Sequence, residues 1–360
     1  LLARQGILYA DVEIGGVALN ILNHNSFADS LAGFVRYPHL EPEEHMGQFR
    51  RQAAAMKCST ILLSAESFFG GAPQLWDMPE GADYLELYTK KLERLKQCLD
   101  GDDCQILVYL RRQEDWLESA IPQVIRYEGL IGKSVYKSDR QLAGLLAPRM
   151  DYEALLDVWE KTIRPVSMTA VPYDRTVILN GSTVDDGIDR LGINRDGLDF
   201  TTGKYDEHAS LSREYVWLKS VLNRIGKSKA TERTIIAILN DLDRRQGSGK
   251  KYAISSGLRQ DIRDQYQKCN QLLSIRFSSR YKDFFPASVF AAEDDASLSR
   301  DEAIRALESF ESEWGRPATA IKAVLAAAKG VLRNKCPWAH TLARRGVSLF
   351  YKTFLNRLSA

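Results

Sequence analysis

Two neighbouring arginines and a serine have the residue types and spacing best suited to bind a phosphate. Arg111 and Arg112 follow the apolar run at 105–110, which predicts a buried strand. Ser119 lies eight residues after Arg111, about two turns into the helix expected from Glu114. A phosphate over the start of that helix can take a charge-assisted contact from the arginine and a hydroxyl contact from the serine. The alternative is a strand-end arginine paired with a neighbouring carboxylate, and a surface serine.

Two further side chains are candidates for the general base of a group transfer. Glu66 follows the expected strand 59–64, so it leaves a parallel sheet at the carboxyl edge, where ligands of open α/β sheets bind. His24 is the second candidate, with an asparagine on either side that can orient its ring. The alternatives are a carboxylate that orders its loop or pairs with an arginine, and a histidine that bonds a loop carbonyl.

The elements that must position these residues alternate between strands and helices over the first 208 residues. Strands are expected at 7–9, 59–64, 105–110 and 167–172. Helices are expected at 42–57, 82–99, from 114, 151–162 and 183–190. Beyond this point only helices are expected, at 211–225, 230–245, 256–276 and 300–313.

This order of elements predicts an α/β fold: a three-layer parallel sheet with helices on both faces and a helical C-terminal extension. The α/β domain is expected over residues 1–292, and a basic helical extension over residues 293–360. From Arg316 onward the chain has nine Lys or Arg and no Asp or Glu. Three roles fit the segment 317–360: peripheral contact with an anionic membrane, a cover over an acidic glycan site, or a helical tail packed on the domain.

Composition narrows the function classes only modestly. The 360 residues are 44% apolar and 27% charged, as in an ordinary globular protein, and a net charge of +2 gives no bias toward nucleic acid. Five widely spaced cysteines suggest reduced thiols in a cytoplasmic protein, and no histidine stands at zinc-ligand spacing. No apolar run reaches the roughly 18 residues of a membrane span.

The segment 247–250, Gly-Ser-Gly-Lys, is similar to the end of a phosphate-binding P-loop. The full pattern needs a glycine five residues before Gly249, where this chain has Arg244. The preceding segment is expected to be a helix and not a strand. We therefore interpret 247–250 as an exposed loop between helices.

The segment Leu110-Arg111-Arg112-Gln113-Glu114-Asp115-Trp116-Leu117-Glu118-Ser119 resembles the 3′-phosphate-binding element of bacterial sulfotransferases. In that family an arginine closes a strand and a serine follows eight positions later. Further segments resemble the family in the same order, at 6–9, 23–25, 61–68, 172–175, 180–182 and 210–212. The resemblance covers roughly residues 1–225.

The resemblance implies a P-loop-type sulfotransferase fold and transfer of a sulfuryl group from 3′-phosphoadenosine 5′-phosphosulfate, without a metal. Arg111, Ser119 and, as a second arginine, Arg112 would bind this donor, and Glu66 or His24 would be the base. The acceptor would be a hydroxyl or amine of a carbohydrate or small molecule.

The sequence departs from the family at two places. The family's phosphosulfate-binding loop should precede residue 1, so we expect the chain to begin downstream of it, near the end of a helix closed by Gly6. Pro122 stands where the family has an ordinary helix former, and a proline there should kink the helix after Ser119.

Two other function classes stay open. One is a non-enzymatic relic of the donor site that acts as a binding or assembly protein. The other is a glycosyltransferase of cell-surface polysaccharide synthesis, which would need an acidic metal-binding motif. Asp185-Asp186 is the adjacent acidic pair near a strand end, but it suits the first turn of the helix that Ser182 can cap.

Overall fold

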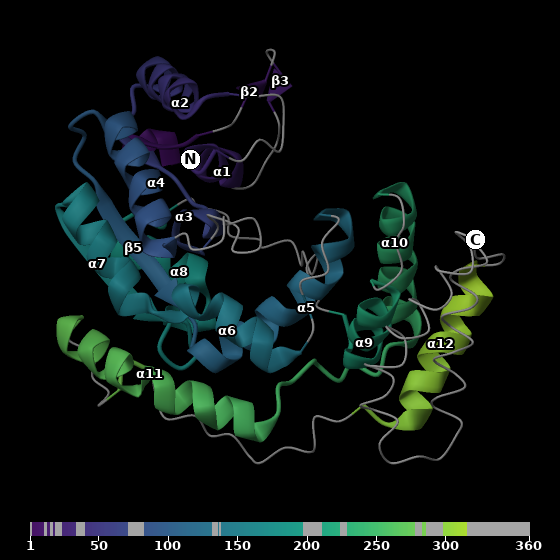
Figure 1. The fold of residues 1–360 in the computed structure, drawn as a ribbon. Helices are drawn as coiled ribbons and strands as arrows, with labels where there is room; N and C mark the ends of the chain where they lie inside the picture. Colours follow the sequence, from purple (N-terminus) through teal and green to yellow (C-terminus); the bar gives the residue numbers. More distant parts are fainter. Residues whose placement is uncertain are drawn as a thin grey trace. The chain divides into compact units, whose positions relative to one another are not determined.

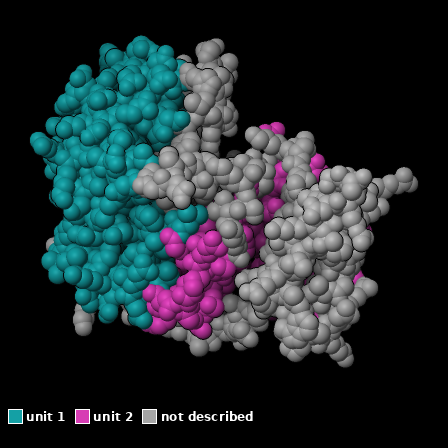
Figure 2. All heavy atoms as spheres, viewed as in Figure 1, with its two compact units in different colours: residues 1–113, 145–204, 262–289 teal, residues 114–144, 205–261, 290–360 magenta. Residues whose placement is uncertain are grey.

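The computed structural model describes residues 2–10, 13–14, 17–18, 24–33, 40–70, 83–131, 136, 138–196, 211–223, 229–277, 283–285 and 298–314. The chain forms two compact units (Figure 2). Unit 1 contains residues 1–113, 145–204 and 262–289, and unit 2 contains residues 114–144, 205–261 and 290–360. The basic segment 317–360 lies outside the described residues, and the expected division after residue 292 stays a prediction.

The strands of unit 1 form pairs. β1 (Ile7–Tyr9) runs parallel to β4 (Thr60–Leu62), and β5 (Gln105–Leu110) runs parallel to β6 (Ser167–Pro172). β2 (Glu13–Ile14) and β3 (Val17–Ala18) form a short antiparallel pair. No hydrogen-bonded ladder joins one pair to another within the described part of the chain.

The predicted three-layer parallel sheet, and with it the P-loop-type sulfotransferase fold, is therefore wrong. All four predicted strands exist, but each has one hydrogen-bonded neighbour, and helices make up most of the described residues. An apolar run identifies a buried strand but does not specify its partner, so the alternation of strands and helices suggested a sheet that does not form.

The other elements in the described part of unit 1 are helices (Figure 1). The α-helices that lie wholly in this unit are α1 (Asn25–Leu31), α2 (Pro42–Met56), α3 (Glu66–Gly70), α4 (Tyr84–Leu99), α7 (Tyr152–Ile163) and α8 (Thr183–Arg190). Two short 3-10 segments accompany them, η1 (Leu2–Gln5) and η3 (Leu179–Gly181). Gly6 follows η1 with a φ of 74°, in agreement with its expected role at the end of a helical turn.

Acidic and hydroxyl side chains begin several of these helices. The Asp83 carboxylate accepts a hydrogen bond from the Leu85 amide at 2.8 Å, which caps α4. The side chain of Ser182 accepts from the Asp185 amide at 3.2 Å, so the predicted cap of α8 is confirmed.

Two groups of apolar side chains form the core of unit 1. α4 packs against α7, with Tyr88 and Leu92 facing Leu155 and Trp159, all of them buried. A second group gathers around the β5–β6 pair: Leu110, Tyr152, Leu156, Ala170, Leu273, Phe284 and Phe285. This second group supports the carboxyl ends of β5 and β6, where the predicted phosphate-binding arginines stand.

All secondary-structure elements in the described part of unit 2 are helices. α9 (Arg213–Leu222), α10 (Lys229–Gln246) and α12 (Arg300–Trp314) lie wholly in this unit and pack against one another. Three more helices belong partly to each unit: α5 (Gln113–Ile131), α6 (Asp139–Met150) and α11 (Ser256–Arg276). Pro122 lies inside α5, where the expected kink stays a prediction. None of the described helices combines the length and the apolar composition needed to cross a bilayer.

Candidate functional site

The carboxyl end of β5 presents Arg111. Its neighbour β6 continues the pairing by one residue, because the Tyr173 amide donates to the Leu110 carbonyl at 2.6 Å. The Arg111 guanidinium carbon lies 4.8 Å from the centre of the Tyr173 ring, and 44% of Tyr173 is exposed. Among the described residues, Arg111 has no carboxylate partner, so its hydrogen-bond donors are available to an anionic ligand.

Hydrogen bonds and ring contacts from other parts of unit 1 fix the chain at Arg111–Gln113. The Tyr152 phenol donates to the Arg111 carbonyl at 2.8 Å. Two residues later, the side-chain amide of Gln113 exchanges two hydrogen bonds with that of Asn270, at 2.8 Å and 3.1 Å. Between them, the Arg112 guanidinium lies over the Phe285 ring at 5.6 Å. The Arg111 carbonyl is therefore fixed by Tyr152, and the side chain of Gln113, next to Arg112, is fixed by Asn270.

Tyr152 also connects this end of β5 to the segment that follows β4. Its ring lies 6.1 Å, centre to centre, from the ring of Phe69 on α3. Phe69 packs against the same core group that contains Leu110. The α3 segment that follows β4 therefore meets the carboxyl end of β5 around one tyrosine, although no strand ladder joins β4 to β5 in the described part of the chain.

Glu66 is the first residue of α3, and its side chain is exposed. The neighbouring segment is well fixed: the Ser67 amide donates to Asn25 Oδ1 at 3.2 Å, and the Phe68 amide donates to the Ala65 carbonyl at 3.3 Å. The structure thus combines an ordered backbone with a carboxylate that a substrate can reach from solvent.

His24 stands inside unit 1 and is only 1% exposed. Its Nε2 lies 2.9 Å from the Ala10 carbonyl oxygen, which can only accept, so Nε2 carries the proton. Its Nδ1 accepts from the Ser64 amide at 2.9 Å. Both ring nitrogens are thus bonded to backbone atoms, and this arrangement matches the structural alternative considered for His24.

Ser119 lies on α5, in the part of that helix that belongs to unit 2. Its hydroxyl donates to the Trp116 carbonyl at 2.8 Å, one turn earlier in the same helix. Arg111 belongs to unit 1, so their joint contact with one phosphate stays a prediction.

Asp185 and Asp186 both stand in the first turn of α8, as expected. Asp186 is buried and accepts from the Tyr109 phenol at 2.8 Å and from the Leu179 amide at 3.0 Å. Asp185 pairs with Arg195. These contacts give the acidic pair a structural role. No group of three or more His, Cys, Asp or Glu in the described ranges is placed to hold a metal ion.

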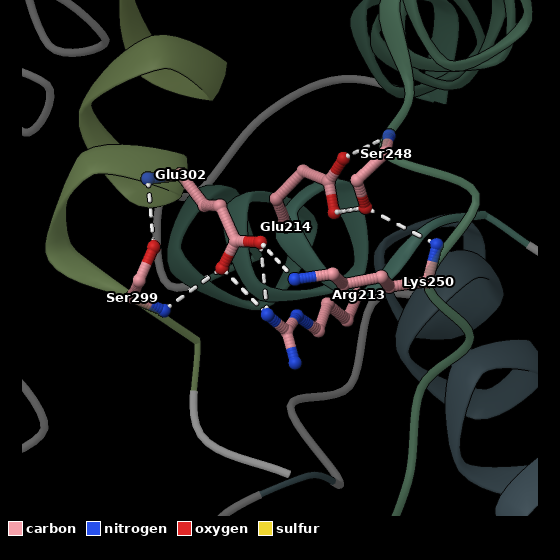
Figure 3. A network of polar contacts seen from close by, with 6 residues as sticks. All are labelled: Arg213, Glu214, Ser248, Lys250, Ser299 and Glu302. Carbon is pink, nitrogen blue, oxygen red and sulfur yellow. Dashed lines mark hydrogen bonds and ion pairs between the residues drawn. The ribbon is translucent and has the colours of Figure 1, made fainter. Parts of the chain in front are cut away.

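The loop after α10 binds carboxylates of its own unit (Figure 3). The amide and the hydroxyl of Ser248 donate to Glu214 at 2.7 Å and 3.0 Å. Lys250 lies 3.3 Å from Glu302, and Arg213 lies 2.7 Å from the same carboxylate. The interpretation of 247–250 as an exposed loop between helices is thus confirmed.

Glu302 is the centre of this network. It is 7% exposed, and burial alone would raise the pKa of its carboxyl group. Hydrogen bonds from Ser299 and from two cationic side chains outweigh that effect and lower the pKa of Glu302 to about 2. A cavity of about 310 Å³ adjoins the network and is lined by Glu214, Tyr215, Gln246, Ser248, Glu302, Arg305, Ala306, Glu308 and Ser309.

Comparison with known proteins yields one distant relative. A protein of Archaeoglobus fulgidus described as uncharacterized is 25% identical over 191 residues, which are 53% of this chain and 50% of that protein. The chain thus spans about half the length of this curated relative. The sequence matches no protein-family model and no solved structure.

Two tyrosines that contact Arg111 at the carboxyl end of β5 were not predicted as site residues from the sequence. Tyr152 and Tyr173 contact Arg111 from positions 41 and 62 residues further along the chain. An isolated tyrosine gives no periodic signal, so their part at the edge became visible only in the fold.

Proposed function

We propose that the edge formed by the carboxyl ends of β5 and β6, with α3 beside it, binds a nucleotide with a 3′-phosphate. We further propose that the whole protein transfers a sulfuryl group from 3′-phosphoadenosine 5′-phosphosulfate. The observation that carries the proposal is Arg111, whose guanidinium is stacked on Tyr173 and has no carboxylate partner among the described residues. A structural arginine at this position would have such a partner, whereas a phosphate-binding arginine keeps its planar fork of donors available.

Arg112 is the second donor for the same phosphate. Glu66 is the base. In the transfer, the acceptor oxygen or nitrogen attacks sulfur, the bond between sulfur and the 5′-phosphate oxygen breaks, and Glu66 takes the acceptor proton. His24 supports the loop that carries Glu66 through its bonds to Ser64 and Ala10. The acceptor is a carbohydrate or a small hydroxylated molecule, and the reaction takes place in the cytoplasm.

Binding of the product nucleotide tests the proposal directly. Adenosine 3′,5′-bisphosphate and adenosine 5′-phosphate are titrated into the protein by calorimetry, and the bisphosphate should bind much more tightly. Arg111→Ala should weaken bisphosphate binding by about 1.5–3 kcal/mol, the usual worth of a hydrogen bond to a charged group.

The matched control is Arg51→Ala, which removes an exposed arginine of α2 in the same unit and should leave affinity unchanged. Equal affinity of the protein for the two nucleotides would contradict the proposed site.

Turnover tests the role of Glu66. Glu66→Gln keeps the shape of the side chain and removes the proton acceptor. Donor affinity should be nearly unchanged, and kcat should fall by about 10² to 10⁴. If turnover survives in this variant and His24→Ala abolishes it with the fold intact, His24 is the base. If the complete protein binds the bisphosphate but transfers no sulfuryl group, it is a non-enzymatic relic.

A further inference from the structure

One face of α4 donates hydrogen bonds to the C-terminal ends of two short helices. Tyr88, Lys91 and Arg94 are spaced three residues apart and therefore lie on the same side of α4. Arg94 Nη1 reaches the carbonyls of the last two residues of α1, at 3.2 Å and 3.3 Å. Lys91 and Tyr88 reach the carbonyls of α3.

The contacts to α3 are short and buried. Lys91 Nζ donates to the Ser67 carbonyl at 2.6 Å and to the Phe68 carbonyl at 2.8 Å. The Tyr88 phenol donates to the Phe69 carbonyl at 2.9 Å. All three acceptors therefore belong to the last turn of α3, whose carbonyls have no partner within their own helix.

These bonds matter because α3 has only five residues. A helix of this length does not form by itself, since it makes too few internal bonds to offset the ordering of its backbone. Carbonyl groups shielded from water also need a donor. A cation at the C-terminal end satisfies them and interacts favourably with the helix dipole.

Burying the charged amine of Lys91 as this donor costs free energy. Lys91 is 2% exposed, and burial lowers the pKa of its amine to about 7, opposed in part by the nearby Asp29 carboxylate. The helix that Lys91 caps also carries a proposed functional group: Glu66 is the first residue of α3 and faces solvent.

We propose that Lys91 is a positioning residue that fixes α3 and thereby sets the direction of the Glu66 carboxylate. His24 and Asn25 hold the amide side of the same segment, at Ser64 and Ser67. Lys91 holds its carbonyl side. The effect on catalysis rests on the proposed function, whereas the effect on the order of α3 does not.

Amide hydrogen exchange and kinetics in the full chain test the inference together. Lys91→Met removes the donors and keeps the length of the side chain. Exchange of the Ser67 and Phe68 amides should become about tenfold faster, the signature of easier local opening. Exchange in β5 and β6 should stay unchanged.

In the transfer reaction, kcat should fall while KM for the donor and its Kd stay constant, which general destabilisation would not produce.

Lys90→Met is the matched control, because Lys90 is the adjacent residue, is exposed and pairs with Glu86. It should leave both measurements at the wild-type value. Should Lys91→Met fail to fold, Tyr88→Phe removes one donor to α3 and should accelerate the Ser67 and Phe68 amides more than the amides of β5 and β6.

Wild-type exchange of Ser67 and Phe68 in either folded variant would overturn the inference. Faster exchange in a protein that transfers no sulfuryl group would instead leave the positioning of α3 intact and contradict the proposed function.

Discussion

The indole Nε1 of Trp159 donates a hydrogen bond of 2.8 Å to the phenol oxygen of Tyr88. Trp159 belongs to α7 and Tyr88 to α4, and neither side chain is more than 6% exposed. Because the same phenol donates to the Phe69 carbonyl, a continuous series of hydrogen bonds runs from α7 through α4 to α3.

Tyr88→Phe should therefore lower the free energy of unfolding by about 1–3 kcal/mol, because the buried indole N–H loses its acceptor. Urea denaturation measures the change. Tyr173→Phe is the control: its phenol is exposed, and its loss should change stability by less than about 0.5 kcal/mol. Equal effects of the two substitutions would show that the indole contact adds nothing.

A second prediction concerns the ion pair between Lys219 of α9 and Glu232 of α10, whose side chains are both 0% exposed. Lys219→Met removes the buried cation that pairs with Glu232 and should cost about 3–5 kcal/mol of unfolding free energy. The double variant Lys219→Met/Glu232→Leu should recover most of that loss, since an apolar pair of similar volume needs no compensation. Denaturation of the single and double variants gives the coupling energy, and strict additivity would contradict the prediction.

A third prediction concerns pH. Burial lowers the pKa of His45 from 6.5 to about 4, and its Nδ1 has no hydrogen-bond partner among the described residues. The unfolded chain therefore binds the proton at His45 more readily than the folded chain. The contribution of neutral His45 to the free energy of unfolding is fully present above pH 6.5 and is lost as the pH falls toward 4. The loss reaches up to about 3 kcal/mol.

Urea denaturation of the wild type and of His45→Leu between pH 7 and pH 4 measures this contribution. The variant lacks the titrating group, so its stability should fall less steeply over the same range. Parallel curves for the two proteins would assign the acid sensitivity to other groups.

The fourth prediction concerns the basic segment 317–360. All 47 acidic residues and 40 of the 49 basic residues precede Arg316, so the rest of the chain is net negative and attracts this segment. The large apolar side chains of Trp338, Phe350 and Phe354 are also more stable when buried. Removal of 317–360 should thus lower the thermal midpoint, and the full chain should sediment little with anionic liposomes. Strong pelleting at physiological salt that depends on the segment would indicate a membrane role.

Local structure could be predicted well from the sequence. The strands at 7–9, 105–110 and 167–172 have the predicted bounds, and α4 and α7 begin and end within two residues of the predicted positions. Long apolar runs and periodic leucines carry strong local signals. α1 and α3 were missed because seven and five residues make at most two turns, too few for a periodic pattern. The twelve-residue helix α6 was missed as well.

Tertiary relationships could not be predicted in the same way. The pairing of β5 with β6 joins residues more than 50 positions apart. The residues of β4 and β5 do not indicate that these strands lack a hydrogen-bonded ladder to each other in the described part of the chain. The three donors on α4 were hidden for a similar reason. The sequence of this helix indicates an apolar stripe, whereas the acceptors of Lys91 lie more than 20 residues upstream.

Free anions such as phosphate and sulfate must compete with two glutamates at the loop after α10. Glu214 is bonded to Ser248, and Glu302 is bonded to Lys250. The amide and ammonium groups that would recognise a free phosphate are occupied by carboxylates on the same chain. A tethered group competes at an effective concentration in the millimolar range or above, at no cost in translational entropy. Phosphate or sulfate must therefore exceed that range before it displaces either glutamate, and this loop should stay occupied by its internal ligands at cellular concentrations of nucleotide.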